Sequence, residues 1–258
     1  MRKFLSVIVV FNSLSPQLSK TFESIKNQTF KDAIEIVPVC TSNIYHGSNE
    51  LLKSLEINFK RLYLDDNGIY SAINLGIKNS AGDYSIIFGA GDAFSGTDSV
   101  EILYSFACHN NYYYLKFDVN VVNIESELIY CNKLLDNNSE LIPKFHHQGI
   151  IIHKNCYNKF GFYSDKYKIY GDFDLFLKIY LLPHFYIDRS LTNFIYGGIS
   201  TPNIRRSYRQ VSELFLVCKN NNALKKFGFK PFLNIILRGI LGVIFPRFTI
   251  FLLKKKNT

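Results

Sequence analysis

The first hundred residues alternate between short apolar runs and segments in which apolar side chains recur at helical spacing. Continuous apolar, β-branched runs predict strands that are covered on both faces, as in a parallel sheet. Recurrence every three or four positions predicts amphipathic helices. We predict strands at 5–11, 34–39, 61–64 and 84–88, and helices at 16–27, 50–57 and 69–79. The alternation indicates right-handed βαβ units and a mostly parallel sheet in an α/β fold.

Beyond residue 97 the alternation is weaker, although three further features can be predicted. Residues 112–122 and 128–131 suit a hairpin, 149–153 a strand, and 172–181 a helix. The apolar face of that helix would consist of Phe173, Phe176, Leu177 and Tyr180. Because no repeat or low-complexity linker interrupts residues 1–200, we predict that they form one domain.

Three carboxylates follow predicted strands directly. Asp65 and Asp66 come after the third strand, and Asp92 ends the turn Gly89-Ala90-Gly91-Asp92 after the fourth. Ligands of parallel sheets bind in the crevice at the carboxyl ends of the strands. We therefore expect these carboxylates to converge over one crevice.

The formal charge of +9 is unevenly distributed along the chain. Residues 1–200 hold 18 Lys and Arg against 20 Asp and Glu, a net of −2, whereas residues 201–258 hold 12 against 1, a net of +11. The basic excess therefore belongs to the tail alone. Nucleic acid and an anionic lipid surface are the two partners that such a tail suggests.

The five cysteines include no CxxC pair, so the sequence indicates neither a disulfide framework nor a zinc site. The first apolar run is short and lacks a small-residue cleavage site, which favours a strand over a signal peptide. We therefore expect a cytoplasmic protein.

The stretch from Asp66 to Phe94 resembles the nucleotide-sugar region of family-2 glycosyltransferases with the GT-A fold; it reads DNGIYSAINLGIKNSAGDYSIIFGAGDAF. Further segments match in the same order: LSVIVVFN with SIKNQTF, HHQGIIIHKNCYNKFGFYSDKYKIYGDFDLFLKIY, and GGIS. Together they span roughly residues 4–215, and the nearest likeness is to small bacterial enzymes that build capsule or O-antigen repeat units. The resemblance implies a GT-A domain over residues 1–200 and inverting transfer of a sugar from a nucleotide sugar, with a UDP-sugar favoured.

On the donor side, the resemblance places Asp92 at the last position of the family's acidic metal motif, where it would hold Mg²⁺ or Mn²⁺. Gly91 would let the phosphates approach the backbone. Asp66 would contact the nucleoside, and Asn74 would lie on the helix that floors the donor pocket. The alternatives are structural: Asp92 as a turn cap, and Asn74 as a cap or turn residue.

On the acceptor side, Asp172 matches the position of the family's catalytic base, which would deprotonate the acceptor hydroxyl. Asp is also an ordinary helix-start residue, and Asp174 is the substitute candidate. His147 and Gln148 match a His-Gln pair near the donor phosphates and the acceptor. A packed or surface role for His147 is the alternative.

Three positions depart from the family pattern. Cys40 stands where relatives carry an Asp for the nucleotide base, Gly91 where many have a first acidic metal residue, and Ser71 where an Asp is common. Two readings stay open: an enzyme with altered donor specificity, and a catalytically silent member that binds a nucleotide sugar or a partner enzyme.

In the tail, residues 201–258, basic residues precede an apolar segment at 231–253, which Arg238 and Arg247 interrupt. A spanning helix needs about 20 consecutive apolar residues, so we predict helices that dock on an anionic membrane surface. Because apolar and basic residues are segregated into blocks, we predict no nucleic-acid partner. A lipid-linked glycan acceptor would lie at the same cytosolic membrane face. Packing of the apolar segment on the domain, and a membrane-surface scaffold, are the alternatives; the sequence indicates no oligomeric state.

Overall fold

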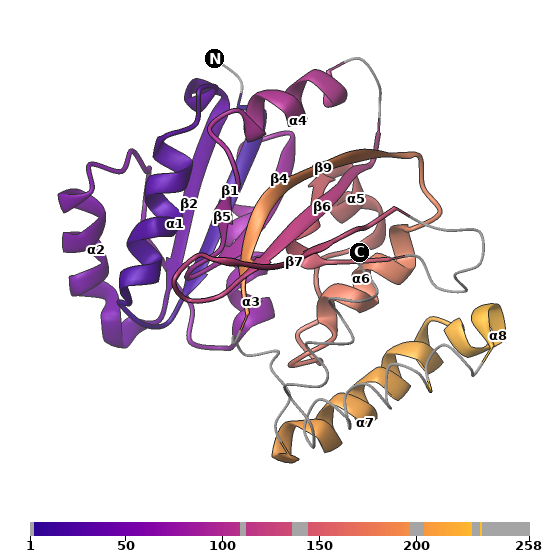
Figure 1. Cartoon of the computed structure of the whole chain (residues 1–258). Helices are drawn as coiled ribbons and strands as arrows, with labels where there is room; N and C mark the ends of the chain where they lie inside the picture. Colours follow the sequence, from indigo (N-terminus) through magenta and orange to yellow (C-terminus); the bar gives the residue numbers. More distant parts are fainter. Residues whose placement is uncertain (1–2, 109–111, 136–143, 197–203, 229–232, 234–258) are drawn as a thin grey trace.

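The computed structural model describes residues 3–108, 112–135, 144–196, 204–228 and 233, and has a central sheet with helices on both faces (Figure 1). The strands are β1 (Leu5–Phe11), β2 (Ile34–Cys40), β3 (Tyr63–Leu64), β4 (Tyr84–Gly89), β5 (Ala93–Phe94), β6 (Tyr114–Val122), β7 (Leu128–Asn132), β8 (Ile150–His153) and β9 (His184–Ile195). The α-helices are α1 (Pro16–Lys26), α2 (Tyr45–Ser54), α3 (Ile69–Lys78), α4 (Ser99–Ala107), α5 (Lys154–Phe160), α6 (Gly171–Ile179), α7 (Ile204–Asn220) and α8 (Ala223–Phe227). Short 3-10 helices are η1 (Lys31–Ala33), η2 (Ser42–Ile44) and η3 (His147–Gly149).

The strands form one sheet in the order β3-β2-β1-β4-β8-β6-β9-β5, with β7 paired to β6. β3, β2, β1 and β4 are parallel, as their alternation with helices predicts. β8 runs antiparallel to both β4 and β6, whereas β9 is parallel to β6 and antiparallel to β5. The predicted α/β fold is confirmed, with a parallel N-terminal half and a mixed second half.

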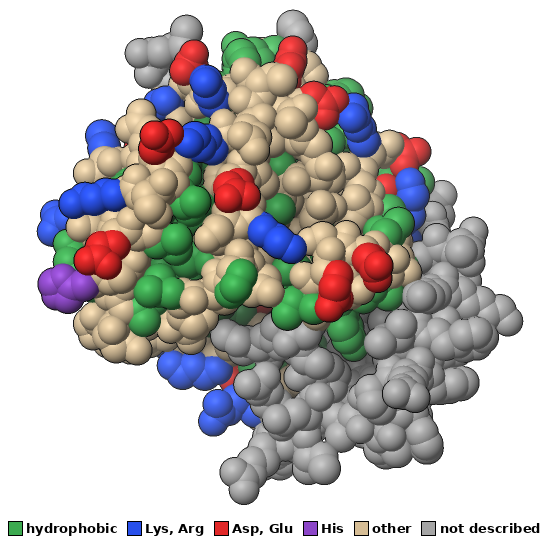
Figure 2. Space-filling view, turned by 60° about the vertical axis from the view of Figure 1, so that its left-hand side comes forward, with side chains coloured by type: hydrophobic (Ala, Val, Ile, Leu, Met, Phe, Trp, Pro, Cys, Tyr) green, Lys and Arg blue, Asp and Glu red, His purple; other side chains and the backbone are tan. Residues whose placement is uncertain are grey.

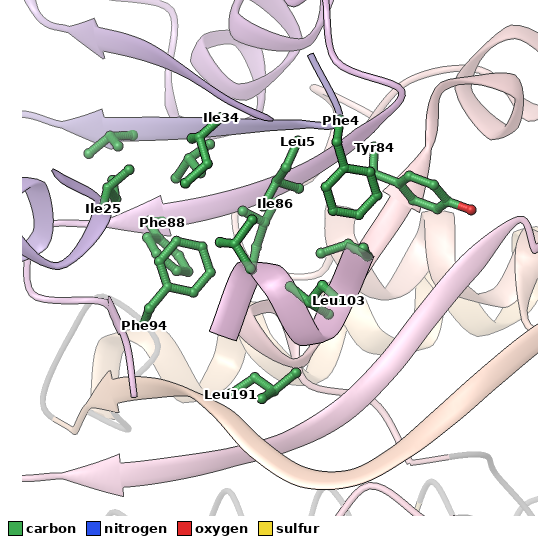
Figure 3. Packing of buried hydrophobic residues seen from close by; sticks show 14 of the residues in the cluster. Phe4, Leu5, Ile25, Ile34, Tyr84, Ile86, Phe88, Phe94, Leu103 and Leu191 are labelled. Atoms are coloured by element: carbon green, nitrogen blue, oxygen red, sulfur yellow. The ribbon is translucent and has the colours of Figure 1, made fainter. Parts of the chain in front are cut away.

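The sheet separates two apolar cores, because successive side chains of a strand point to opposite faces. Leu5, Val7 and Val9 of β1 pack on the face that α1 and α4 cover, whereas Ile8 packs on the face of α3 and α6. Figure 3 shows part of the first core, with side chains from β1, β4, α4 and β9 facing one another. The prediction that the continuous apolar run of β1 is covered on both faces is confirmed.

Two helices have features that the sequence pattern does not predict. The helix predicted at 50–57 begins earlier, at Tyr45, after the 3-10 turn of η2. α3 begins at Ile69 as predicted, but Ile69 is 39% exposed, whereas Tyr70 is buried. Tyr70 is drawn inward because its hydroxyl reaches the carbonyl of Ile169 at 2.6 Å.

β9 is a twelve-residue strand that the sequence pattern does not predict. Its central residues Asp188, Arg189 and Ser190 interrupt any apolar alternation, and its register with β6 shifts around Asp118. Figure 1 shows β9 following β6 and then reaching β5. This path carries Thr192 and Ile195 to the turn that follows β4.

α7 packs against the body of the molecule through one face. Leu214, Val217 and Cys218 are buried in the core that α6 and α3 share. Part of the predicted tail therefore belongs to the core, while the division at residue 200 falls in a segment outside the described residues. The apolar segment at 231–253 also lies outside them, apart from Leu233. In the described part of the chain, no helix is long and apolar enough to span a membrane.

Charges of both signs are mixed on the face that Figure 2 shows, where Lys and Arg side chains lie among Asp and Glu side chains. This mixing agrees with the near-neutral balance of residues 1–200. Over the described residues of this face, Lys and Arg side chains do not form a broad basic surface of the kind that tracks a nucleic-acid backbone.

Candidate active site

The carboxyl ends of β2 and β3 bring Asp65 and Asp66 beside the loop that follows Cys40. The Asp65 amide donates to the Cys40 carbonyl at 3.0 Å, and the Ser42 amide donates to Asp66 Oδ1 at 2.9 Å. This hydrogen bond from Ser42 lowers the pKa of Asp66 from its ordinary value. Asp66 is exposed, so an ionised carboxylate lies fixed at the rim of the sheet.

Ser71, where the family commonly has Asp, holds the neighbouring carboxylate in place. Its hydroxyl donates to Asp65 Oδ2 at 2.7 Å, and the Asn67 amide donates to Asp65 Oδ1 at 2.7 Å. An Asp at position 71 would put a second negative charge against Asp65. The departure at Ser71 thus has a local physical reason.

A cation lies beside the same loop. Gly68 opens α3 with φ +109°, a region that glycine adopts readily, and a Cβ added there would lie 3.6 Å from Lys168 Nζ. Lys168 lies shortly before α6 in the chain, and its ammonium group lies close to Gly68, at the start of α3.

Asp92 lies at the end of β4 and is only 5% exposed. Its Oδ2 accepts hydrogen bonds from the Gly89 amide at 2.7 Å and from Gln148 Nε2 at 2.9 Å. Burial raises the pKa of Asp92 to about 6, while hydrogen bonds from Gly89, Gln148 and the Ile195 backbone act in the opposite direction. The carboxylate therefore joins β4, η3 and β9.

Gly91 is confined by its surroundings. It has φ +105°, its amide donates to Thr21 Oγ1 at 2.8 Å, and an added Cβ would lie 2.6 Å from Ile195 Cδ1. A larger residue would be strained at this positive φ and would displace the Ile195 side chain. The glycine at position 91 therefore agrees with the local backbone conformation and packing.

The fit of a divalent cation can be judged from Asp92 itself. Mg²⁺ and Mn²⁺ need several accessible oxygen ligands, and even a site completed by substrate phosphates uses one or two open carboxylates. Asp92 is buried and already accepts hydrogen bonds from three elements. Among the described residues, no group of three or more His, Cys, Asp or Glu side chains is placed to hold a metal. As arranged here, Asp92 does not fit an open metal ligand.

Asp172 stands in the first turn of α6, as predicted, and is partly exposed. Its Oδ1 accepts from the Phe173 amide at 2.9 Å and lies 3.1 Å from the Tyr70 hydroxyl. Burial and the charge of Asp172 raise the pKa of Tyr70, so that hydroxyl stays protonated and acts as a donor. Each oxygen of a carboxylate can accept more than one hydrogen bond, and Asp172 is partly exposed, so a substrate hydroxyl can still bond to it.

His147 belongs to the same group of side chains. Its Nε2 lies 3.2 Å from the Tyr163 hydroxyl, and the Tyr163 ring stacks on Tyr70 with centroids 6.0 Å apart. Burial lowers the pKa of His147, although the charge of Asp172 opposes that effect. The structure therefore brings His147 and Asp172 together and, through the adjacent Gln148, connects them with Asp92.

Asp174, the substitute base, occupies a different setting. It is 3% exposed, and its two oxygens accept from Lys178 Nζ at 2.6 Å and from Asn221 Nδ2 at 2.8 Å. Asp174 therefore ties α6 to the end of α7. Of these two acidic residues, Asp172 is the one that a substrate can reach.

Asn74 bridges two segments instead of facing open space. Its Nδ2 donates to the Tyr163 carbonyl at 2.8 Å, and its Oδ1 accepts from the Tyr163 amide at 3.0 Å. Both ends of the amide are thus engaged, which is the structural role that the sequence left open for this residue.

Tyr70 and Tyr163 were not singled out from the sequence, although both lie in segments that carry the family resemblance. An aromatic residue among apolar neighbours predicts core packing, and both side chains do pack there. Their hydroxyl contacts depend on α6 and η3, which come together only in the fold.

Comparison with known proteins agrees with this architecture. The S. aureus TarS fragment 1–349 in complex with UDP superposes with a TM-score of 0.65 at 14% identity, over 83% of this chain and 64% of that fragment. The mannosyltransferase PcManGT from Pyrobaculum calidifontis, in complex with GDP-Man and Mn²⁺, gives 0.64 at 15% identity, over 94% of this chain and 70% of that one. The GT-A fold implied by the sequence resemblance is confirmed, and the chain spans less than two thirds of the TarS fragment.

No curated protein matches the chain by sequence. The family model described as Glycosyl transferase family 2 matches residues 6–170, which is more than half of the chain. That range includes β1 to β4, the loop at Asp66, Asp92 and the His147-Gln148 pair. The chain therefore belongs to glycosyl transferase family 2.

Proposed function

We propose that the chain transfers a sugar from a nucleotide-sugar donor to a hydroxyl group of a glycan acceptor, with Asp172 as the catalytic base. The observation that carries this proposal is the contrast within α6: Asp172 is partly exposed, whereas Asp174 is buried and paired with Lys178. A base must reach the proton that it removes, and only the first arrangement allows this.

In the proposed reaction, Asp172 accepts the proton of the acceptor hydroxyl as its oxygen attacks the anomeric carbon. The bond from that carbon to the diphosphate breaks on the opposite face, and the nucleoside diphosphate leaves with the bonding electrons. This single displacement inverts the anomeric centre. Hydrogen bonds from Phe173 and Tyr70 hold Asp172 in place for the transfer.

On the donor side, Asp66 is proposed to meet the nucleoside. It is exposed and fixed by Ser42, whereas burial raises the pKa of the neighbouring Cys40 thiol and keeps it neutral. In the proposed site, Asp66 therefore contacts the nucleoside in place of the Asp that relatives carry at the position of Cys40. A UDP-sugar is the proposed donor; UDP-GlcNAc is bound by TarS and GDP-Man by PcManGT, so both belong in the test.

The departing diphosphate needs positive charge, which Lys168 beside Gly68 is placed to supply. A divalent cation is present in the PcManGT complex, where it accompanies GDP-Man. Because the arrangement of Asp92 does not fit an open ligand, we assign no step to such a cation here. The Mg²⁺ or Mn²⁺ requirement stays a prediction of the family resemblance.

The acceptor is proposed to be a lipid-linked glycan used in bacterial surface polysaccharide synthesis, reached at the cytosolic face of a membrane. Support comes from the outer side of α7, where Phe215 and Leu216 are 53% and 47% exposed. Arg209 and Lys219 on the same helix are also exposed. Exposed apolar side chains beside cations suit an anionic lipid surface.

Co-sedimentation with phosphatidylglycerol vesicles tests this surface. The double variant Phe215→Ser/Leu216→Ser should pellet less than the wild type. Leu128→Ser should pellet like the wild type, because Leu128 is also an exposed apolar side chain but belongs to β7 and not to α7. Equal pelleting of all three proteins would show that α7 does not dock on lipid.

The transfer activity is tested by nucleotide release from a panel of donors that includes UDP-GlcNAc and GDP-mannose, with a polyprenyl-phosphate-linked acceptor. Release is measured with Mn²⁺ and with a chelator. It should depend on both donor and acceptor, and it should be lost in Asp172→Asn. Release that is unchanged in Asp172→Asn would remove Asp172 from the base role.

The second candidate is a catalytically silent member that binds a nucleotide sugar. Cys40 and the engaged carboxylate of Asp92 favour it, because both depart from an open donor site. Stabilisation of the folded chain by a nucleoside diphosphate without any donor turnover would support this candidate against the enzyme.

A further inference from the structure

Glu213 of α7 is a buried carboxylate, 8% exposed, in a helix whose outer side faces solvent. Its Oε2 accepts hydrogen bonds from the backbone amides of Ile169 at 2.8 Å, Lys168 at 3.0 Å and Tyr170 at 3.4 Å, and its Oε1 accepts from Lys168 at 3.1 Å. Three consecutive amides thus converge on one side chain, directly before α6 begins at Gly171.

The fixed segment leads to the proposed base by two contacts. The Ile169 carbonyl accepts the Tyr70 hydroxyl at 2.6 Å, and that hydroxyl also lies 3.1 Å from Asp172 Oδ1. A hydroxyl has one proton, so the position of the Ile169 carbonyl decides how it is shared between the two acceptors. The same contact fixes the position of the Tyr70 ring against Gly171. The ring lies so close that a Cβ atom added at Gly171 would be 2.8 Å from it.

The sequence carries a matching signal. Glu213 is the one acidic residue among residues 201–258, which hold 12 Lys and Arg. A carboxylate buried in such a segment loses hydration, and charge-assisted hydrogen bonds from backbone amides replace it. These amides belong to the three residues that directly precede α6.

We propose that Glu213 is a positioning residue for the transfer reaction: from α7 it holds Lys168, Ile169 and Tyr170 so that Tyr70 orients Asp172. This inference rests on the proposed function, since it assigns Asp172 as the base. It extends the catalytic unit from α6 to α7, which lies beyond the residues that the family model matches. Glu213 itself touches no reacting atom.

The test compares Glu213→Gln with Asp174→Asn. Both variants neutralise a buried carboxylate that ties α7 to the segment around α6, but Asp174 bonds to Asn221 and Lys178 and not to the Ile169 loop. Glu213→Gln should lower kcat for nucleotide release about tenfold or more, since small displacements of reacting groups are costly. The Kd for UDP should rise by less than the fall in kcat and by no more than Lys168→Ala raises it, because the Ser42 and Asp66 contact lies on other elements.

A double-mutant cycle with Tyr70→Phe gives the readout that a purely structural role would not move. If Glu213 acts through Tyr70, the two substitutions together should lower kcat by much less than the product of their separate effects. Glu213→Asp, with the same charge but a shorter side chain, should recover part of kcat.

The outcomes separate the two claims. If Asp172→Asn abolishes release while Glu213→Gln matches Asp174→Asn, or if the cycle with Tyr70→Phe is additive, the positioning role is wrong and the proposed function stands. If wild-type chain releases no nucleotide from any donor, the proposed function fails and this inference with it.

Discussion

The carboxylates of the candidate site differ in what surrounds them, and this difference sets what each can do. Asp66 is exposed and has a lowered pKa, whereas Asp92 is buried and has a pKa raised to about 6. Asp172 is partly exposed, and hydrogen bonds from Phe173 and Tyr70 hold it in place. At the residue scale, then, one acid suits a fixed rim charge, one a structural contact and one proton transfer.

Asp92 makes the stability of the chain depend on pH with a definite sign. Its folded pKa, about 6, exceeds the ordinary value of 3.8, so the folded state binds the proton more tightly than the unfolded state does. Stability from this group is therefore present below the unfolded pKa and is lost as pH rises through about 6. Between about pH 4 and about pH 7, the free energy of unfolding of wild type relative to Asp92→Asn should fall by about 3 kcal/mol at most.

Urea denaturation at several pH values measures this difference. A stability difference between wild type and Asp92→Asn that stays constant, or grows, as the pH rises would show that the folded chain does not raise the pKa of Asp92.

Lys168 provides a second prediction at this scale. If its ammonium group faces the diphosphate, Lys168→Ala should raise the Kd for UDP about fivefold, which corresponds to about 1 kcal/mol for one exposed charge pair. Lys166→Ala is the matched control, because Lys166 is also exposed and lies two residues away. Isothermal titration measures both; equal values for the two variants would remove Lys168 from the donor site.

At the scale of elements, the candidate site is built by contacts between α3, η3, β9 and the segment before α6. α3 follows from the sequence because its apolar side chains recur at helical spacing, as β1 does because it is a continuous apolar run, and both positions are predicted within a residue or two. The position of β9 does not follow from the sequence, because Asp188, Arg189 and Ser190 lie in its middle and its pairing with β6 is irregular. Since β9 brings Ile195 to Gly91 and Asp92, their burial could not be predicted either.

Asn74 illustrates the same limit at a single contact. Its position on α3 follows from the sequence, but its partner is the backbone of Tyr163, 89 residues away. Loss of the bridge in Asn74→Ala leaves a partly buried amide and carbonyl without their partner, which should cost about 1–3 kcal/mol of stability. Asn79→Ala on the same helix removes an exposed bond to Leu75 and should cost far less.

Thermal or urea unfolding of the two variants measures this contrast. If Asn74→Ala is no less stable than Asn79→Ala, the bridge between α3 and the Tyr163 segment contributes nothing to the fold.

At the scale of the whole molecule, α7 joins the GT-A body, where its buried side and exposed side have different tasks. Leu214, Val217 and Cys218 complete a core, Glu213 fixes the segment before α6, and Phe215 and Leu216 remain exposed. The charge balance of residues 201–258 predicts a separate surface for this region. The core packing of α7 was not predicted, because a basic helix with one acidic residue gives no sign of what that residue meets.

Truncation tests this integration. A chain that ends at residue 203 loses α7 and uncovers part of the core beside α6, so its melting temperature should fall well below that of a chain that ends at residue 228. Equal melting temperatures would show that α7 is not part of the folded unit.

The base role of Asp172 is tested most directly by measuring UDP binding and donor-dependent nucleotide release side by side in wild type, Asp172→Asn and Asp174→Asn. We predict that all three proteins bind UDP with similar Kd, that Asp174→Asn keeps much of the release activity, and that Asp172→Asn loses nearly all of it. Release by Asp172→Asn at the wild-type rate would contradict the proposed mechanism.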